Sequence, residues 1–215
     1  MITGDEEGEA VNGSVRLLDW AEAQGQRFDG CIVGEPTAPA VLGDLAKIGR
    51  RGSLNAKLAV HGRQGHVAYP HRADNAAHRL VAMLAALTAM RLDEGTEWFP
   101  ASSLQISSID IGNPTSNVIP GTARAAFNIR FNDLHTGASL EARLRGLLDG
   151  LGGRYELGIS VSGEAFRTER GHLSACVEAA VQEVTGSLPA FDTSGGTSDA
   201  RFVARYCPVV ELGLV

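Results

Sequence analysis

Three glutamates stand where predicted strands end, and carboxylates in such places can bind a metal ion or transfer a proton. Glu6 and Glu7 follow the short start of the chain, and Glu35 follows the apolar run Cys31–Val33. Ligand sites of open α/β sheets gather at the carboxyl ends of strands. Adjacent residues of an extended chain point to opposite sides, so we expect different roles for Glu6 and Glu7, such as general base and metal ligand. The alternative is a solvated acidic pair.

A histidine in a shaped loop is the second candidate group. His66 lies between Gly62 and His71, in a segment that contains further glycine and continues into Tyr69 and Pro70. Such residues mark a turn after a strand, and a histidine held there can donate a hydrogen bond to a developing oxyanion. A surface histidine without a catalytic role fits the same pattern.

Further segments carry groups that bind anions. Ser194–Asp199 is a glycine-rich loop whose backbone N–H groups can cradle an anion, although it lacks the lysine of a phosphate-binding loop. Arg50 and Arg51 suit carboxylates, unless they form only a solvated basic turn. Asn117 lies in a loop between two strands, where a turn residue is the simpler interpretation. The chain has no Gly-x-Ser-x-Gly elbow for a serine nucleophile.

The elements that must position these groups follow a defined order in the middle of the chain. Periodicity and turn residues predict strands and helices at 53–61 (strand), 74–91 (helix, capped by Asp74), 103–111 (strand, with a bulge), 122–131 (strand), 140–148 (helix) and 155–161 (strand). The order β-α-β-β-α-β is ferredoxin-like. Such a sheet packs both helices on one face and leaves a polar face free, here with Asn128 and Arg130.

The flanking segments differ from this block. Short apolar runs at 31–33 and 208–212 alternate with helical patterns at 12–24 and 172–185, which favours an α/β layer. We therefore expect an α/β protein with three parts. They are a first part of the catalytic domain at 1–50, an inserted ferredoxin-like domain at 51–164, and a second part of the catalytic domain at 165–215.

Composition narrows the classes of partner. The net charge is −6 with 44% hydrophobic and 20% charged residues, typical of a globular domain and unsuited to sequence-independent nucleic-acid binding. No stretch reaches the roughly 18 apolar residues of a membrane span, and residues 1–20 lack the pattern of a signal peptide. Three distant cysteines favour a reducing, cytoplasmic location over a disulfide framework.

Taken together, the motifs resemble those of the M20 family of dinuclear-zinc peptidases and deacylases. The segments that carry the resemblance occur in the family's order and span most of the chain. They are Ile2–Gly8, Val33–Thr37, Lys47–Ser53, Gly65–His71, Thr115–Pro120 and Ser194–Phe202.

The resemblance implies a role for individual residues. Glu6 would be the general acid/base, and Glu7 and Glu35 would each bind one of two zinc ions, with cobalt as the alternative metal. His66, on the inserted lid and dimerisation domain, would reach the active site of the partner subunit in a homodimer and stabilise the tetrahedral oxyanion. Residues implied to line the pocket and hold substrate carboxylates are Arg50, Ser53, Tyr69, Asn117, Arg130, Gly196 and Thr197.

Parts of the family pattern are missing from this chain. The family's metal-binding His and bridging Asp upstream of Glu6, and its late metal-binding His, have no counterpart here. Catalytic zinc normally takes three protein ligands. We therefore expect a truncated chain that is inactive alone and binds zinc weakly.

The implied activity is amide hydrolysis. Lys47–Ser53 and Gly65–His71 point most narrowly to hydrolysis of N-succinyl-LL-2,6-diaminopimelate to succinate and LL-2,6-diaminopimelate, a step of lysine and diaminopimelate biosynthesis. Acetylornithine deacetylase or carboxypeptidase activity is the alternative within the family. A non-catalytic dimerisation or ligand-binding module is the alternative outside it.

Overall fold

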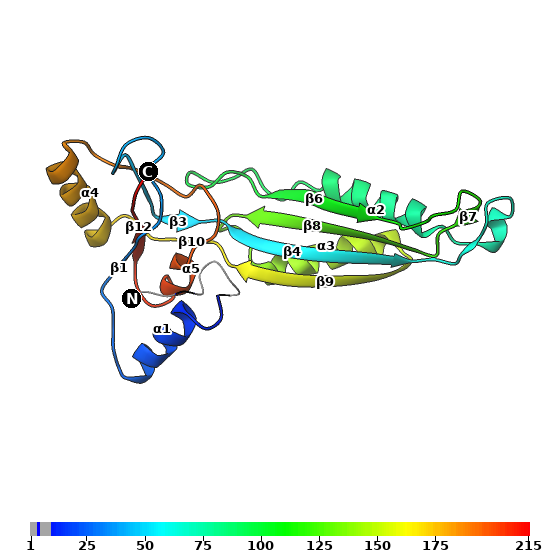
Figure 1. Ribbon diagram of the computed structural model, residues 1–215, viewed down its shortest axis with the longest axis horizontal. Helices are drawn as coiled ribbons and strands as arrows, with labels where there is room; N and C mark the ends of the chain where they lie inside the picture. The colour runs from blue at the N-terminus through cyan, green and yellow to red at the C-terminus, as the bar shows by residue number, and fades with distance from the viewer. Residues whose placement is uncertain (1–3, 5–9) are drawn as a thin grey trace. The chain divides into compact units, whose positions relative to one another are not determined.

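The computed structural model describes residue 4 and residues 10–215, so Glu6 and Glu7 lie outside the described residues (Figure 1). It confirms the predicted mixed α/β class. The chain divides into two compact units. The first consists of Met1–Arg51, Thr96–Phe99 and Gly163–Val215, and the second of Gly52–Gly95 and Pro100–Ser162. The assignment of these units as catalytic domain and lid stays a prediction.

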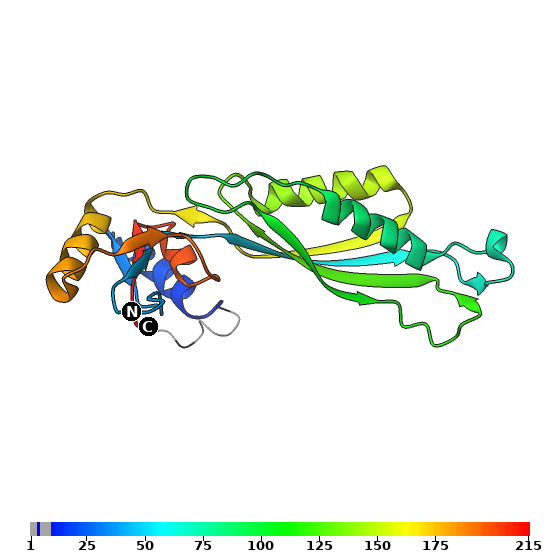
Figure 2. The ribbon, with the colours of Figure 1, turned by 90° about the horizontal axis from the view of Figure 1, so that it is seen from above.

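The second unit is a four-stranded sheet with two helices on one face (Figure 2). Its main elements are β4 (Gly52–His61), α2 (Ala76–Ala89), β6 (Ser103–Asp110), β8 (Thr122–Phe131), α3 (Gly137–Leu151) and β9 (Arg154–Gly163). The sheet order is β6-β8-β4-β9, and β8 pairs antiparallel with both β4 and β6. The first and third strands thus lie in the centre, as the ferredoxin-like prediction requires.

Alternation along the central strands produces the core of this unit. Leu54 and Leu58 of β4 and Phe127 and Ile129 of β8 are buried, whereas Asn55, one residue along, is exposed. On the helices, apolar residues three or four positions apart bury one side of each against the sheet. These residues are Leu80, Met83, Leu84, Leu87, Leu140, Leu144 and Leu148. The opposite face of the sheet is therefore left with its polar side chains.

Local details of this unit differ in part from the predictions. The predicted bulge in β6 is confirmed by a register shift between Ile106 and Ser108. The predicted cap of α2 is wrong: Asn75, not Asp74, accepts from the backbone N–H groups that begin the helix, at 3.0 and 3.3 Å. Asp74 instead accepts from Arg79 Nε at 2.7 Å. Asp and Asn both cap helices well, but the Asp74 carboxylate binds the Arg79 guanidinium and does not accept from the first backbone N–H groups of the helix.

The alternating apolar side chains of β9 are only partly buried. Leu157 is buried, whereas Val161, in the same alternating set, is exposed. β9 is an edge strand, so its side chains have a neighbouring strand on one side alone. Alternation predicted the strand correctly but not the depth of its burial.

A glycine at the start of β4 gives the first testable prediction. A Cβ on Gly52 would lie 2.2 Å from the fully buried ring of Phe131, which has no space to move. We expect Gly52→Ala to lower the free energy of unfolding by about 1–3 kcal/mol through overpacking. Urea denaturation followed by circular dichroism measures this change.

A matched glycine provides the control. Gly146 lies inside α3 with no atom within 4 Å of a Cβ built there, so Gly146→Ala should stabilise by about 0.5–1 kcal/mol. Equal stability of Gly52→Ala and wild type would contradict the close contact with Phe131.

A buried carboxylate ties the loop before β6 to the end of β8. Asp93 accepts from the backbone N–H groups of Gly95 and Ser102 at 2.7 and 3.1 Å, and from Asn132 Nδ2 at 2.7 Å. His135 Nε2 lies 3.0 Å from its other oxygen. Burial raises the pKa of Asp93, but the hydrogen bonds outweigh it and lower the pKa to about 2.

This lowered pKa predicts a pH dependence of stability. Because the pKa of Asp93 is lower in the folded than in the unfolded chain, its contribution is complete above about pH 4 and is lost as the pH falls toward 2. The share of the loss that is due to Asp93 should reach about 2 kcal/mol, so stability should fall by about that much less in Asp93→Asn than in wild type, while the other carboxylates still titrate. Unfolding curves between pH 2 and 5 test this, with the exposed Asp133→Asn as control. A wild-type curve that is flat over this range would contradict it.

The first unit is a small mixed sheet covered by helices. Its elements are α1 (Ser14–Ala23), β1 (Cys31–Val33), β2 (Leu45–Lys47), β3 (Gly49–Arg50), β10 (Phe166–Arg167), α4 (His172–Thr185), β11 (Ala190–Asp192), α5 (Ala200–Val203) and β12 (Val209–Glu211). The sheet order is β1-β12-β2-β11, with β1 and β12 parallel, β2 and β11 parallel, and β12 antiparallel to β2. β3 and β10 form a separate antiparallel pair.

Two apolar clusters form the core of the first unit. Val209 packs with α1 and α5, while its neighbour Val210 packs with α4. Adjacent residues of a strand point to opposite faces, so these helices cover opposite faces of the sheet. The helix α4 ends at Gly186, which adopts the left-handed conformation common at helix ends.

The remaining elements are short. β5 (Gly65–His66) pairs antiparallel with β7 (Val118–Ile119), and η1 (Pro70–Arg72) follows β5. Among the described residues, no helix has both the length and the apolar character needed to cross a bilayer.

Candidate functional site

Glu35 lies two residues beyond β1, at the sheet edge where the parallel strands β1 and β12 end together. Val33 at the end of β1 is the register partner of Glu211 at the end of β12. Backbone hydrogen bonds continue past both strands, from Leu212 N to Val33 O at 3.0 Å and from Ala38 N to Leu214 O at 3.2 Å. The half-buried Glu35 is thus held beside β12, at a carboxyl-end position typical of α/β sites.

Arg50 is held by a carboxylate of the chain itself. Its Nε lies 3.0 and 2.9 Å from the two carboxylate oxygens of Glu211, and its Nη2 also donates to this group. Nη1 donates to the backbone oxygen of Ser194 at 3.0 Å. Arg50 and Glu211 are 7% and 1% exposed, so this is a buried ion pair.

A second ion pair holds the start of the glycine-rich loop. Lys47 Nζ donates to Asp192 Oδ1 at 2.9 Å and to Ser194 Oγ at 2.8 Å, and Ser194 Oγ donates to Asp192 Oδ2 at 2.7 Å. Burial raises the pKa of Asp192, but the hydrogen bonds from Lys47 and Ser194 prevail and lower it. Asp192 therefore remains a carboxylate at neutral pH.

The tip of this loop is open. Gly195 has φ +100°, and a Cβ there would lie 2.3 Å from Arg50 Nη1, so the loop backbone covers the guanidinium closely. Gly196 is exposed with no atom within 4 Å of a Cβ position, and Thr197 is half-buried. Ser198, which follows, is buried and donates to Glu211 Oε1 at 2.5 Å.

The second unit brings His66 and Asn117 together. The pairing of β5 with β7 sets His66 opposite Val118, and Val67 N donates to Asn117 O at 3.0 Å. His66 Nδ1 accepts from Ala68 N at 3.1 Å, so the neutral ring carries its proton on Nε2. The Tyr69 ring lies 5.9 Å from the His66 ring, centroid to centroid. The His66 side chain is exposed, so its Nε2–H group can donate a hydrogen bond to a bound molecule.

Ser53 and Arg130 lie together at the other end of the same sheet. They are register partners in β4 and β8, and Asn128 Nδ2 donates to Ser53 Oγ at 3.1 Å. Ser53 is buried and Arg130 is half-buried, on the polar face opposite the helices.

The described candidate residues therefore form three groups. The first unit contains Glu35, Arg50, Gly196 and Thr197. The β5–β7 pair has His66, Tyr69 and Asn117 beside it, and the start of β4 with the paired end of β8 holds Ser53 and Arg130. Ser53 and His61 are eight residues apart on β4, or roughly 26 Å, and the β5–β7 pair lies beyond that end (Figure 1). Within one chain, His66 and Arg130 do not line one pocket.

The described residues do not by themselves supply a metal centre. Residue 4 and residues 10–215 contain no group of three His, Cys, Asp or Glu side chains placed to hold an ion. Of the ligands that the resemblance implies, the described residues include Glu35 alone, whereas catalytic zinc takes three. We therefore derive no step through a metal from this chain.

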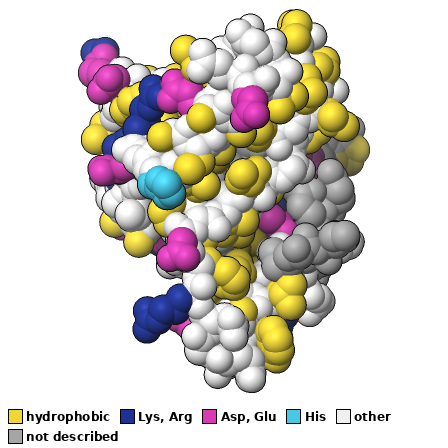
Figure 3. Space-filling model, turned by 90° about the vertical axis from the view of Figure 1, so that its left-hand side faces the viewer, with side chains coloured by type: hydrophobic (Ala, Val, Ile, Leu, Met, Phe, Trp, Pro, Cys, Tyr) yellow, Lys and Arg dark blue, Asp and Glu magenta, His cyan; other side chains and the backbone are white. Residues whose placement is uncertain are grey.

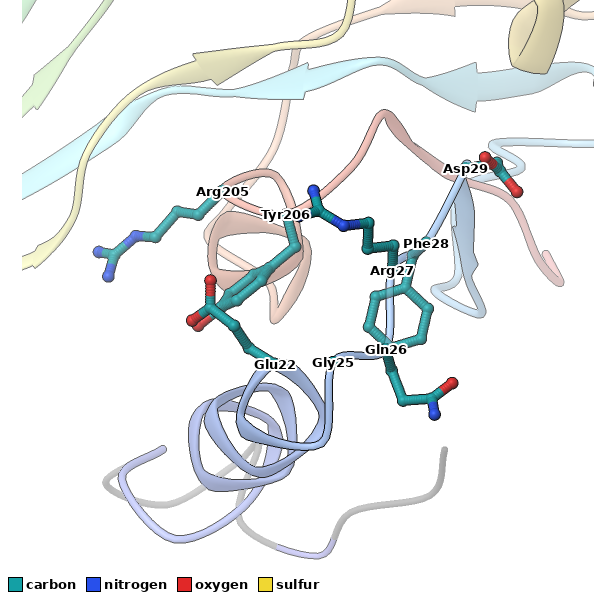
Figure 4. A pocket seen from close by; sticks show the side chains of 8 residues that line it. All are labelled: Glu22, Gly25, Gln26, Arg27, Phe28, Asp29, Arg205 and Tyr206. Carbon is teal, nitrogen blue, oxygen red and sulfur yellow. The ribbon is translucent and has the colours of Figure 1, made fainter.

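A pocket elsewhere in the first unit does not involve these groups. It measures about 500 Å³ and lies between the end of α1 and the segment after α5; its lining residues are Glu22, Gly25, Gln26, Arg27, Phe28, Asp29, Arg205 and Tyr206 (Figure 4). The side chains of Arg27, Gln26 and Arg205 extend in different directions, so they do not converge on one ligand.

Comparison with known proteins defines the class. The family model for the peptidase dimerisation domain of M20 proteins matches residues 48–156. The chain belongs to the M20 family, as the motifs predicted.

Curated relatives are similar over the whole of this chain. Succinyl-diaminopimelate desuccinylases from Gluconacetobacter diazotrophicus and Rhodospirillum centenum are 59% and 58% identical to it over 215 residues. The chain spans 56% of the length of each of these relatives.

Solved structures share the fold. An M20 family metallo-carboxypeptidase from Sulfolobus solfataricus matches 97% of this chain and 60% of its own, with a TM-score of 0.76 and 16% identity. The aminopeptidase PepT from Bacillus cereus matches 99% of this chain and 54% of its own, with a TM-score of 0.74 and 16% identity.

The sequence prediction missed the partners that hold the loop. Glu211, Asp192 and Lys47 received no individual role. A signal existed for Glu211: it stands in the apolar run Pro208–Leu212, where a buried carboxylate requires a charged partner. No pattern in the sequence identified Arg50 as that partner.

Proposed function

We propose that the full-length protein containing this chain hydrolyses N-succinyl-LL-2,6-diaminopimelate to succinate and LL-2,6-diaminopimelate, within lysine and diaminopimelate biosynthesis. The observation that carries the proposal is the 54–59% identity, over all 215 residues, to relatives named for this activity. The M20 neighbours of known structure fit other hydrolases of the family equally well by fold, but they share only 16% of residues.

The proposed catalytic residues divide between proton transfer and metal binding. Glu6 acts as general acid/base, and Glu7 and Glu35 each contribute to one of two zinc sites, with cobalt as the alternative metal. Zinc, when bound by the full ligand set, supplies a water of lowered pKa and polarises the amide carbonyl. The position of Glu35 at the carboxyl ends of β1 and β12 supports its part.

His66 is proposed to stabilise the tetrahedral oxyanion. Its Nδ1 already accepts a backbone hydrogen bond, which leaves Nε2–H as the donor that an oxyanion requires. Asn117, across the β5–β7 pair, is proposed to approach the substrate from the same side.

The proposed active enzyme is a homodimer. The family model that matches residues 48–156 describes a peptidase dimerisation domain, and His66 lies beyond the far end of β4 from Ser53 and Arg130. A pocket that uses all three therefore takes His66 from the partner subunit. The lid and dimer interface are proposed to be the inserted domain.

Polar groups within each unit are proposed to bind substrate carboxylates. Arg130 and Ser53 share the free face of the sheet. The exposed Gly196 and the half-buried Thr197 follow Gly195, whose backbone lies against Arg50. Tyr69, beside His66, completes the set.

The proposed location is the cytoplasm, with neither nucleic acid nor membrane as partner. All three cysteines of the chain are free thiols, which suits a reducing compartment. On the face in Figure 3, basic side chains lie scattered among acidic and hydrophobic ones, whereas a nucleic-acid surface gathers them in a patch.

Substrate specificity of the full-length protein tests the proposal. We expect turnover of N-succinyl-LL-2,6-diaminopimelate to exceed that of N-acetylornithine and of dipeptides in kcat/KM. The 215-residue chain, assayed beside it, should be inactive because it holds too few metal ligands. Preference for acetylornithine or a dipeptide would replace the proposed substrate, and inactivity on all three would favour the dimerisation module.

A further inference from the structure

Glu211 has no role in the proposed reaction, yet it is among the most deeply buried charged groups of the described chain. It is 1% exposed and belongs to β12, next to the buried Val209 and Val210. A buried ion pair seldom stabilises more than apolar residues of the same volume would, because both charges lose their hydration. Stability alone therefore does not account for a carboxylate at this position.

We propose that Glu211 is a positioning residue that orients Arg50 to bind a carboxylate of the substrate. This inference rests on the proposed function. Glu211 occupies the Nε and Nη2 side of the guanidinium, and Ser194 O takes one N–H of Nη1. An arginine offers five N–H donors, so one on each Nη atom has no acceptor among the described residues. In the proposal, these two N–H groups bind the second carboxylate.

The same carboxylate also connects Arg50 with the glycine-rich loop. Ser198 Oγ donates to Glu211 Oε1 at 2.5 Å, while Arg50 reaches Ser194 at the start of the loop. Lys47 and Asp192 hold Ser194 from the other side. Both ends of the segment Ser194–Ser198 are thus fixed by buried or half-buried charged groups.

The Arg50 guanidinium is thus held in one orientation against the backbone of the glycine-rich loop. Gly195 lies close enough to Arg50 Nη1 to exclude a Cβ, whereas the exposed Gly196 has no atom within 4 Å of a Cβ position. A guanidinium that is already oriented loses little side-chain entropy when a carboxylate binds. Glu211 therefore contributes to substrate affinity without contacting the substrate.

A double-mutant cycle in the full-length protein tests the inference. Glu211→Gln keeps the shape of the side chain but removes its charge, and we expect KM to rise about 10–100-fold while kcat changes less than about 3-fold. Arg50→Gln should raise KM by a similar factor. If Glu211 acts through Arg50, the double variant should have the KM of Arg50→Gln and not the product of both effects.

Two further variants control for folding. Glu178→Gln breaks an exposed ion pair with Arg170 in the same unit and should leave KM unchanged. Ser198→Ala removes one hydrogen bond of Glu211 and should raise KM a few-fold even if Glu211→Gln folds poorly. Thermal unfolding of each variant is measured alongside.

The outcomes separate the inference from the proposed function. An unchanged KM for both Glu211→Gln and Ser198→Ala, or effects of Glu211→Gln and Arg50→Gln that multiply, would overturn the positioning role. If wild type prefers acetylornithine or a dipeptide, the proposed substrate fails, but the same cycle is run with that carboxylate-bearing substrate.

Discussion

Replacing Glu6 with alanine in the full-length protein is expected to reduce kcat by about 10²–10⁴-fold, the range that a general acid/base contributes. The metal content should stay the same, because Glu6 is proposed to move a proton and not to bind zinc. Steady-state kinetics together with metal analysis of the purified protein measure both quantities.

The neighbouring glutamate provides the matched control. Glu7→Ala is expected to lower both metal content and turnover, because Glu7 is the proposed ligand. The two substitutions thus separate proton transfer from metal binding within adjacent residues. Normal kcat in Glu6→Ala, or loss of metal from it, would contradict the division of roles.

The second large effect concerns His66. His66→Ala in the full-length protein is expected to lower kcat by about 10²–10³-fold with a smaller change in KM, because an oxyanion donor acts in the transition state. The exposed His78 on α2 is the control, and His78→Ala should behave as wild type.

Mixing two inactive variants tests whether His66 acts in the partner subunit. In a dimer of one Glu6→Ala chain and one His66→Ala chain, one active site combines two intact residues and the other combines both substitutions. Random exchange of equal amounts should therefore restore about a quarter of wild-type activity. If the mixture remains as inactive as its components, His66 acts within its own chain.

The central sheet was predictable because each of its strands carries its own signal. The alternation in β4 and β8 buries one set of side chains, and the same alternation predicted both strands and their common face. The depth of burial of β9 was not predictable, since it depends on how many strands flank it. The cap of α2 was missed because Asp74 and Asn75 are equally suited and a contact with Arg79 decides between them.

The candidate site was predictable only as a set of residues. The motifs indicated Glu35, His66 and the loop at Ser194, and the structure brings His66 beside Asn117 through the pairing of β5 with β7. The pairing of Arg50 with Glu211 joins residues 161 positions apart, and local patterns carry no information on such contacts. Substrate roles for these residues stay predictions.

The distance from Ser53 to the β5–β7 pair has a consequence for how the proposed enzyme would respond to its own abundance. If each active site takes its oxyanion donor from the partner subunit, a newly synthesised monomer has no catalytic activity. Specific activity would then fall on dilution below the dissociation constant of the pair and return on concentration. A small molecule that binds His66 would inhibit the proposed enzyme without competing with the substrate for the metal ions.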